Sequence, residues 1–265
     1  MLGPSRLYSC AIYPHPAASL EEAQAHKIDV LIHKAGIAPH HDVLDIGCGW
    51  GTLLQAIHAR QRCRVHGISL SKEQIDHCRE VLPEGRFECI DYRELDRQAA
   101  YDRIMSVGMI EHVGLDQLPV FAATVARLLK PGGRAVLHTM IVGDTLDLPP
   151  GEHLSAFATR HIMPVGYVPR ADDLVRAIVG CGDLRIVHQE RFGPHYGKTM
   201  RRWRQNVLLE ADAIARAYST EHVRAYDYLW AVAAACFTST AFDLLQIVVD
   251  KGPIENVAPV YDPRM

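Results

Sequence analysis

The glycine-rich stretch LDIGCGWG, at residues 44–51, constrains the fold of this chain more than any other feature. It follows a short apolar run that is typical of a buried strand, and it precedes the helical pattern TLLQAIHARQ at 52–61. Because Gly47, Gly49 and Gly51 have no side chains, backbone N–H groups and the start of the helix can approach a ligand closely. The stretch therefore indicates a strand–loop–helix unit that binds a nucleotide or cofactor, with a plain tight turn as the alternative.

The residues around this loop favour one kind of cofactor. The spacing is G-x-G-x-G, not the G-x-G-x-x-G of dinucleotide-binding folds, and Asp45 precedes the first glycine. A carboxylate there would repel a pyrophosphate but suits a cationic ligand, such as the amino group or sulfonium of S-adenosyl-L-methionine (SAM). Dinucleotide folds place an acidic residue after the second strand, whereas GISLSKEQ (67–74) offers Ser69 and Gln74 to a ribose.

Strand and helix patterns alternate along the chain. Strand patterns fall at 42–47, 64–70, 86–91, 101–108, 134–142, 184–192 and 243–249, and helical patterns at 19–37, 52–61, 71–82, 118–130 and 172–181. The first helix opens with Ser19 and has Glu22 three residues later, which is a capping box. Alternation of this kind predicts an α/β fold with a doubly wound, mostly parallel sheet.

The composition and the positions of the prolines and glycines predict one soluble domain over residues 1–265. Apolar residues make up 48% of the chain and charged residues 22%, which is ordinary for a globular protein. A proline-rich insert at 143–170 interrupts the alternation and is a candidate lid or substrate wall. The apolar window 228–249 contains Asp243 and Gln246, so we expect a buried helix and a strand, not a membrane span.

Charge, cysteines and histidines exclude several classes of partner. A net charge of -3 gives no argument for nucleic acid and allows at most a local, peripheral membrane contact. The seven cysteines are odd in number and form no C-x-x-C pair, so we expect a reducing, cytoplasmic environment. The fifteen histidines show no H-E-x-x-H or similar spacing, and we expect no metal site.

A carboxylate and an imidazole lie near the ends of two neighbouring predicted strands. Glu111 follows the strand at 101–108, and His138 lies on the strand at 134–142. Open α/β sheets bind ligands at the carboxyl ends of their strands, so these groups can converge and hold an anion that acts as a base. The alternative is that Glu111 caps a helix and His138 is a core histidine. His112, beside Glu111, is either structural or functional.

Eight blocks, in order, carry a resemblance to a known family. They are LYSCAIY, SLEEAQAHKID, VLDIGCGWG, GISLSKEQ, YDRIMSVGMIEHVG, LLKPGGRAVLHTM, RHIMPVGYVPR and GPHYGKTMRRWRQN. Together they resemble the cyclopropane-fatty-acyl-phospholipid synthases and mycolic acid cyclopropane synthases, which are SAM-dependent methyltransferases, over nearly the whole chain. The resemblance implies a Rossmann-like class I methyltransferase fold whose last strand is antiparallel.

The resemblance also implies a reaction and its residues. In that family the alkene of an acyl chain attacks the SAM methyl group, and a bound bicarbonate then removes a proton from the carbocation, giving a cyclopropane or methyl-branched product. By motif, the bicarbonate ligands are the side chains of Glu111, His138 and Tyr196 and the backbone N–H groups of Cys10 and Met140. The family usually has isoleucine where this chain has Met140.

The implied SAM-binding residues come from three of these blocks and from the stretch DYRE at 91–94. They are Tyr8, Ser9, Asp45, Gly47, Cys48, Gly49, Ser69, Leu70, Gln74, Asp91 and Tyr92. The loop reads DYRE where the family often has a Trp-Glu pair. In KTMRRWRQN (198–206), arginines flank Trp203, which suits phosphate head groups or a solvated helix face.

Three functions remain open from the residues. The first is C-methylation of an unsaturated acyl lipid. The second is methylation of another hydrophobic small molecule, such as a secondary metabolite, on the same fold. The third is SAM binding without catalysis, against which the complete set of Glu111, His138 and Tyr196 argues. Neither the double bond attacked nor the carrier of the acyl chain follows from the sequence.

The family normally carries a helical segment, opening with a His-Tyr-Asp block, before the Tyr-Ser-Cys-Ala motif. This chain begins MLGPSRLYSC, so we expect its natural start to lie upstream. Intact-mass measurement of the protein from its native locus should exceed 29.5 kDa. A mass equal to that value would contradict the expectation.

Overall fold

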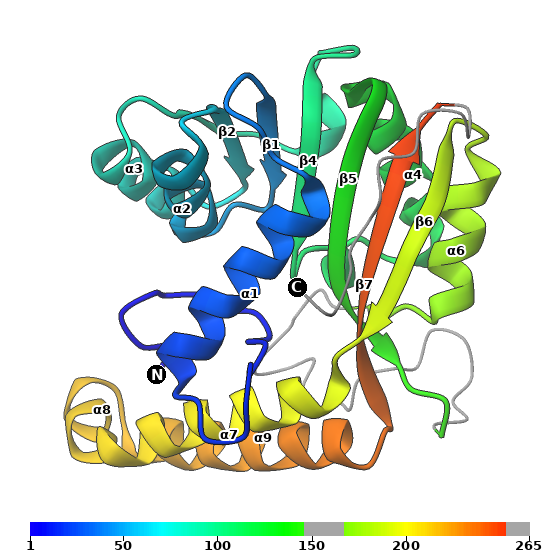
Figure 1. Ribbon diagram of the computed structural model, residues 1–265. Coiled ribbons are helices and arrows are strands. Elements are labelled where there is room, and N and C mark those ends of the chain that lie inside the picture. The colour runs from blue at the N-terminus through cyan, green and yellow to red at the C-terminus, as the bar shows by residue number, and fades with distance from the viewer. Residues whose placement is uncertain (146–166, 253–265) are drawn as a thin grey trace.

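The computed structural model describes residues 1–145 and 167–252, which build one seven-stranded sheet with helices on both faces (Figure 1). The strands are β1 (Asp42–Ile46), β2 (Arg64–Ser69), β3 (Arg86–Cys89), β4 (Tyr101–Val107), β5 (Leu129–Val142), β6 (Leu184–Arg191) and β7 (Phe242–Lys251). Their order in the sheet is β3-β2-β1-β4-β5-β7-β6. The pairs from β3 to β5 are parallel, and β7 runs antiparallel to both β5 and β6, which confirms the predicted mostly parallel sheet with an antiparallel last strand.

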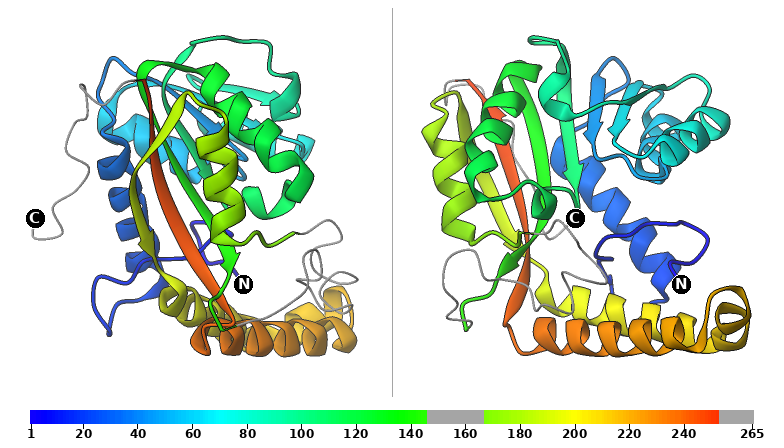
Figure 2. Two further views of the ribbon diagram at one scale, coloured as in Figure 1. Left: turned by 90° about the vertical axis from the view of Figure 1, so that its right-hand side faces the viewer. Right: turned by 180° about the vertical axis from the view of Figure 1, so that it is seen from behind.

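The helices form two layers on the sheet and a third across one end of it. They are α1 (Leu20–Ala35), α2 (Thr52–Gln61), α3 (Lys72–Val81), α4 (Leu118–Leu128), α6 (Ala171–Gly180), α7 (Gly193–Leu209), α8 (Ala211–Ala217) and α9 (Thr220–Thr238). One apolar cluster joins α1, α2 and α3 to one face, and another joins α4 and α6 to the opposite face (Figure 2). The third cluster packs the N-terminal segment on α7 and α9, which lie side by side below the carboxyl ends of the strands (Figure 1).

Helix α1 shows how the sequence sets both the ends of a helix and its buried face. Ser19 and Glu22 form the predicted capping box, and Gly36 ends the helix with a φ of 58°. The buried residues recur at the three- and four-residue spacing of a helix face, and they include three polar side chains: Gln24, Lys27 and Lys34. These polar groups on an apolar face bear directly on the site described below.

Two sequence predictions differ from the structure. The helix predicted at 118–130 ends at Leu128, because Leu129 already pairs with Tyr101 at the start of β5. The next pairing is Arg103 with Arg134, so residues 130–133 bulge within the strand and do not simply close the helix. Helix α9 is also less buried than predicted, since only Trp230, Ala234 and Phe237 among its residues are buried.

The predicted insert at 143–170 lies largely outside the described residues. Its described end, however, returns to the sheet. The backbone N–H of Tyr167 donates to the carbonyl of Glu111 at 2.7 Å, and the N–H of Val142 donates to the carbonyl of Pro169 at 2.9 Å. Val168 between them is buried. This segment therefore contacts the backbone of one of the predicted catalytic residues.

Candidate active site

A cavity of about 270 Å³ opens at the carboxyl ends of β1, β2 and β4. Several predicted cofactor residues line it: Tyr8, Ser9, Asp45, Gly47, Cys48, Gly49, Ser69 and Gln74. The remaining three lie elsewhere among the described residues. The Leu70 side chain is 73% exposed, Asp91 pairs with Arg93 at 2.6 Å, and Tyr92 packs edge-on against Phe121.

The glycine loop is tied to the neighbouring strand and leaves no room for a side chain at Gly47 or Gly51. The N–H groups of Gly47 and Cys48 both donate to the carbonyl of Ile68 on β2, at 3.0 Å each. Gly47 has a φ of 90°, and a Cβ there would lie 2.9 Å from Cγ of Met109. Gly51 begins α2 without a side-chain cap. The first N–H groups of α2 are therefore free of a side-chain acceptor at the edge of the cavity.

Two buried groups of opposite charge lie in the wall of this cavity. Asp45 is 2% exposed, and its Oδ1 has no hydrogen-bond partner among the described residues. Burial raises the pKa of Asp45 to about 7, an effect that the charge of Lys27 opposes. Lys27 is 1% exposed, its Nζ donates to Oγ of Ser9 at 2.9 Å, and burial lowers its pKa to about 8. Both groups thus pay a desolvation penalty that a ligand with complementary charges would relieve.

The ribose candidates are held by each other at the end of β2. Oγ of Ser69 donates to Oε1 of Gln74 at 2.9 Å, and the N–H of Ser71 donates to the same Ser69 oxygen at 3.2 Å. Ser71 in turn caps α3 through the N–H of Gln74. The two polar side chains that line the cavity are therefore fixed by the cap of the following helix.

Glu111 and Tyr196 form a second polar group next to the cavity. Glu111 follows β4 in the short helix η2 (Ile110–His112), is 4% exposed, and accepts a 2.8 Å hydrogen bond from the Thr139 hydroxyl. Burial raises the pKa of Glu111, although bonds from Thr139 and the Met140 backbone N–H oppose the shift. Burial also raises the pKa of Tyr196 well above its ordinary value, with the nearby charge of Glu111 adding to it. Both groups therefore favour their neutral, protonated forms.

His138 is oriented by two polar side chains from distant parts of the chain. Nζ of Lys34 donates to Oε1 of Gln246 at 2.6 Å, and Nε2 of Gln246 lies 2.9 Å from Nδ1 of His138. Because a lysine ammonium only donates, it fixes the amide so that Gln246 donates to Nδ1. The proton of the neutral ring must then sit on Nε2, which is buried and has no partner among the described residues. Burial lowers the pKa of His138 well below its ordinary value, so the ring stays neutral.

The predicted anion ligands fall into two groups. Thr139, which holds Glu111, and His138 are consecutive on β5 and so point to opposite faces. Cys10 is buried and close enough to raise the pKa of Tyr196 and to respond to the charge of Lys27. The N–H of Met140 is directed at Glu111 itself. Glu111, Tyr196 and Cys10 are thus close enough to affect one another, whereas His138 contacts Gln246 and is affected by the charges of Lys27 and Lys34 on α1.

Lys27 and His112 are among the lining residues that were not assigned as ligands from the sequence. Lys27 falls on the apolar face of the predicted helix 19–37, and this misplaced charge was the signal that could have revealed it. His112 also lines the cavity, beside Met109 and Gly108. The adjacent Glu111 and His112 thus differ in their surroundings. The Glu111 carboxyl is buried, and the His112 imidazole is exposed at the wall of the cavity.

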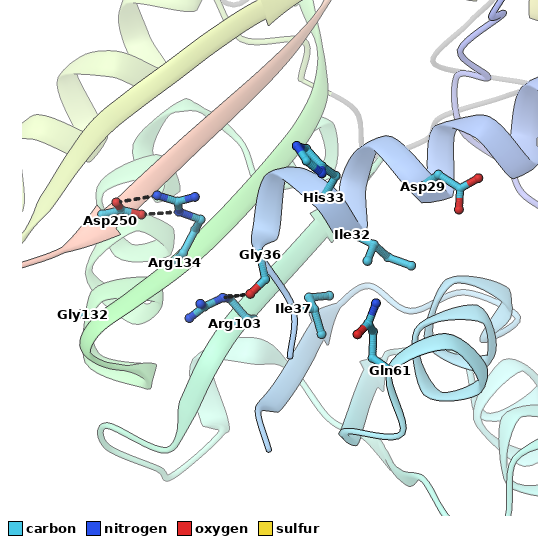
Figure 3. Close-up of a pocket in the computed structure, with 10 residues that line it drawn as sticks. All are labelled: Asp29, Ile32, His33, Gly36, Ile37, Gln61, Arg103, Gly132, Arg134 and Asp250. Carbon is cyan, nitrogen blue, oxygen red and sulfur yellow. Dashed lines mark hydrogen bonds and ion pairs between the residues drawn. The ribbon is translucent and has the colours of Figure 1, made fainter. Parts of the chain in front are cut away.

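A second cavity, of about 470 Å³, lies at the opposite ends of the strands (Figure 3). It contains the ion pair between Arg134 and Asp250, at 2.7 and 2.9 Å, and Arg103, which donates to the carbonyl of Gly36 at 3.2 Å. Since open α/β sheets bind ligands at the carboxyl ends of their strands, the smaller cavity is the candidate site.

Metal-binding clusters and membrane-spanning helices are absent from the described ranges 1–145 and 167–252. No three His, Cys, Asp or Glu side chains there gather closely enough to hold a metal ion. Within the same ranges, no helix combines the length and the apolar character that a bilayer crossing requires.

The sheet order, the antiparallel seventh strand and the glycine loop together define the fold of SAM-dependent methyltransferases. The chain belongs to the mycolic acid cyclopropane synthetase family, whose model matches residues 1–247. It is 35% identical to the cyclopropane-fatty-acyl-phospholipid synthase of Escherichia coli over 261 residues, covering 97% of this chain and 65% of that protein. The chain thus spans slightly less than two thirds of that relative's length.

Two solved structures of the family share the fold over most of their length. The cyclopropane synthase MmaA2 from Mycobacterium tuberculosis aligns with a TM-score of 0.86 at 28% identity, covering 94% of this chain and 92% of that one. The mycolic acid cyclopropane synthase CmaA1, complexed with SAH and CTAB, aligns with a TM-score of 0.86 at 27% identity and the same coverage.

We expect Asp45→Asn to stabilise the ligand-free protein. Because the folded-state pKa of about 7 lies above the ordinary value of 3.8, the wild type loses stability as the pH rises through this window. Asparagine does not titrate, so the free energy of unfolding of the variant should exceed that of the wild type by an amount that grows from pH 4 to 7. The difference should reach about 1–3 kcal/mol at pH 8. Urea unfolding at pH 5 and pH 8 measures it.

The matched control is Asp250→Asn, which breaks the buried pair with Arg134 and should destabilise the protein at both pH values. A loss of stability in Asp45→Asn at pH 8 would show that its carboxylate is satisfied in the folded protein.

We also predict that His138 is neutral and protonated on Nε2. Nitrogen-15 chemical shifts of histidine-labelled protein at pH 7 distinguish the two ring nitrogens. His195, whose Nδ1 accepts from the N–H of Tyr13 at 2.9 Å, should show the same tautomer and serves as the reference. Gln246→Leu should release the ring of His138 to a mixture of tautomers. A wild-type ring protonated on Nδ1 would contradict the proposed orientation.

Proposed function

We propose that this protein transfers a methyl or methylene group from SAM to the double bond of an unsaturated acyl chain, and that bicarbonate acts as the base. The observation that carries the proposal is the set of buried polar side chains Glu111, His138 and Tyr196 beside a cavity suited to SAM. Membership of the cyclopropane synthetase family supports the reaction class. The product is either a cyclopropane or a methyl branch.

The cavity has the groups that SAM requires. The glycine loop and the uncapped start of α2 offer backbone donors, Asp45 offers an unpartnered carboxylate oxygen, and Ser69 with Gln74 offers ribose partners. When bound, SAM supplies a methyl group on a positively charged sulfur. CmaA1, a family member with this fold, has been crystallised with SAH, which supports the same ligand here.

The second polar group fits a small anion. His138 presents a buried Nε2–H that has no partner among the described residues, and burial raises the pKa of both Tyr196 and Glu111. Neutral donors attract a monoanion without adding a buried charge of the same sign, and burial shifts Glu111 toward that form. In the proposed site the backbone N–H of Cys10 completes this cradle, together with the N–H of Met140, which Glu111 would share with the anion. Bound there, bicarbonate would supply a base and a counter-charge to the carbocation.

An aromatic cluster packs behind Tyr8, which lines the cavity. Tyr8 stacks on Trp203 with ring centroids 5.4 Å apart, and Trp230 meets Trp203 edge-on at 5.1 Å. Tyr196 contacts Trp203 at 6.0 Å and Phe237 at 4.8 Å. Such rings provide apolar area for an acyl chain, exclude water, and stabilise a developing cation through their π faces.

Trp203 is fully buried in this cluster, which corrects the view that it joins the neighbouring arginines at lipid head groups.

The remaining parts of the proposal are a single domain over residues 1–265, with the insert at 143–170 as its lid or substrate wall, and a cytoplasmic location with at most peripheral membrane contact. All seven cysteines are free thiols in the structure, which suits a reducing compartment.

Incubation with methyl-labelled SAM tests the function. Vesicles of phospholipid with monounsaturated chains should take up label, and vesicles with saturated chains of equal length should not. Removal of dissolved CO₂ should slow the reaction, and added bicarbonate should restore it. Label found only in a pool of small hydrophobic metabolites would favour the alternative function, methylation of a secondary metabolite. SAH binding without transfer to any pool would favour a binding protein and contradict the proposal.

We predict that Glu111→Gln keeps SAH affinity but lowers turnover by about 100-fold or more, because an amide cannot take up and release a proton beside the anion. Calorimetric titration with SAH and the rate of label transfer measure the two effects. Glu88→Gln, at a partly buried carboxylate on β3, is the control and should turn over normally. A native rate in Glu111→Gln would show that the carboxyl plays no part in the anion cradle.

A further inference from the structure

We propose that Lys27 binds the carboxylate of the SAM methionine group while Asp45 binds its ammonium, so that the two side chains clamp the amino acid end of the ligand. Nothing in the sequence motifs assigns Lys27 a ligand. The inference deepens the proposed function and rests on its choice of SAM as the methyl donor.

The first observation is the position of the Lys27 ammonium. It projects from the buried face of α1 into the wall of the candidate cavity, where Ser9 and Asp45 also lie. Among the described residues its hydrogen bond goes to Oγ of Ser9 at 2.9 Å, which uses one of the three N–H donors. Two donors remain for an acceptor from the cavity. A buried ammonium with spare donors is costly unless an anion completes its shell.

The second observation is independent and lies on a different element. Oδ1 of Asp45, at the end of β1, is fully buried and has no hydrogen-bond partner among the described residues. It requires a donor, and a carboxylate in this setting is best matched by a cation. Lys27 and Asp45 influence each other electrostatically but share no hydrogen bond within those residues, so each keeps capacity for a ligand.

A ligand that satisfies both groups must carry an anion and a cation on a small framework. An α-amino acid has this arrangement, since its carboxylate and ammonium are attached to one carbon atom. The methionine group of SAM is such an amino acid. Ser69 and Gln74, the ribose candidates, follow β2, next to β1 in the sheet. The nucleoside would therefore lie toward β2 and the amino acid toward α1.

Lys27 has one competing role that the test must separate. With Gln24, whose Nε2 donates to the Ser9 carbonyl at 3.0 Å, it pins the N-terminal segment over the cavity. Loss of this anchor would weaken any ligand in the cavity. Loss of a carboxylate partner would weaken only ligands that carry the carboxylate.

The experiment is a set of calorimetric titrations with SAH and with decarboxylated SAH, which lacks only the carboxylate. The wild type should prefer SAH by about 10- to 100-fold, the range expected for a buried charge-assisted contact. Lys27→Met should lose this preference through weaker SAH binding, while the affinity for decarboxylated SAH changes by less than about threefold or improves. Lys27→Gln, which keeps a donor for Ser9 but no charge, should behave in the same way and guards against a folding defect in the first variant.

Gln24→Leu is the matched control, because it removes the other anchor on Ser9, and Gln24 is not among the residues that line the cavity. Any loss of affinity in this variant should be equal for both ligands. Asp45→Asn should weaken SAH and decarboxylated SAH alike, since both keep the amine. Equal losses for the two ligands in the Lys27 variants, or unchanged SAH binding, would overturn the clamp while leaving SAM as the methyl donor. A wild type that binds neither ligand would overturn the choice of SAM as well.

Discussion

Three polar side chains on the buried face of α1 hold the separate parts of the site together. Gln24 and Lys27 bind the N-terminal segment at Ser9, and Lys34 binds Gln246 on β7 and Glu190 on β6. Desolvation of each buried lysine lowers the stability of the fold by several kcal/mol unless partners surround the ammonium. The lysines therefore stay buried only while those partners are in place. A single helix thereby links the cofactor cavity, through Lys27, to the anion cradle, through Lys34.

Both halves of the site bury polar side chains in a medium of low dielectric, but with different results. In the cofactor half, Asp45 and Lys27 stay under-satisfied, and this favours a charged ligand over an empty cavity. In the other half, burial disfavours the charged forms of Glu111, His138 and Tyr196, which limits the charge placed beside the proposed anion. Both halves depend on low dielectric, which the apolar clusters on the two faces and the aromatic layer of α7 and α9 provide.

Much of the fold followed from local patterns, and the limits of the prediction have physical causes. The glycine loop and the placement of Glu111 and His138 at strand ends were predictable because alternation fixes which end of a parallel sheet collects them. The bulge at 130–133 was not, since it depends on pairing with β4. The partner of His138 could not be predicted either, because Gln246 is 108 residues away and meets it only through the register of β5 with β7. Arginine-flanked Trp203 looked like a surface residue because its burial is due to contacts with Tyr8 and Trp230 from distant segments.

The long antiparallel pairing of β5 with β7 gives the protein an order of assembly. The glycine loop is tied to β2 within the stretch from Gly47 to Ile68, so it can form soon after that part of the chain leaves the ribosome. The tautomer of His138 is set by Gln246, on the last strand of the sheet, and must wait for contacts of high sequence separation. The orientation of the imidazole therefore depends on pairing between distant parts of the chain, whereas the shape of the glycine loop depends on its immediate neighbours.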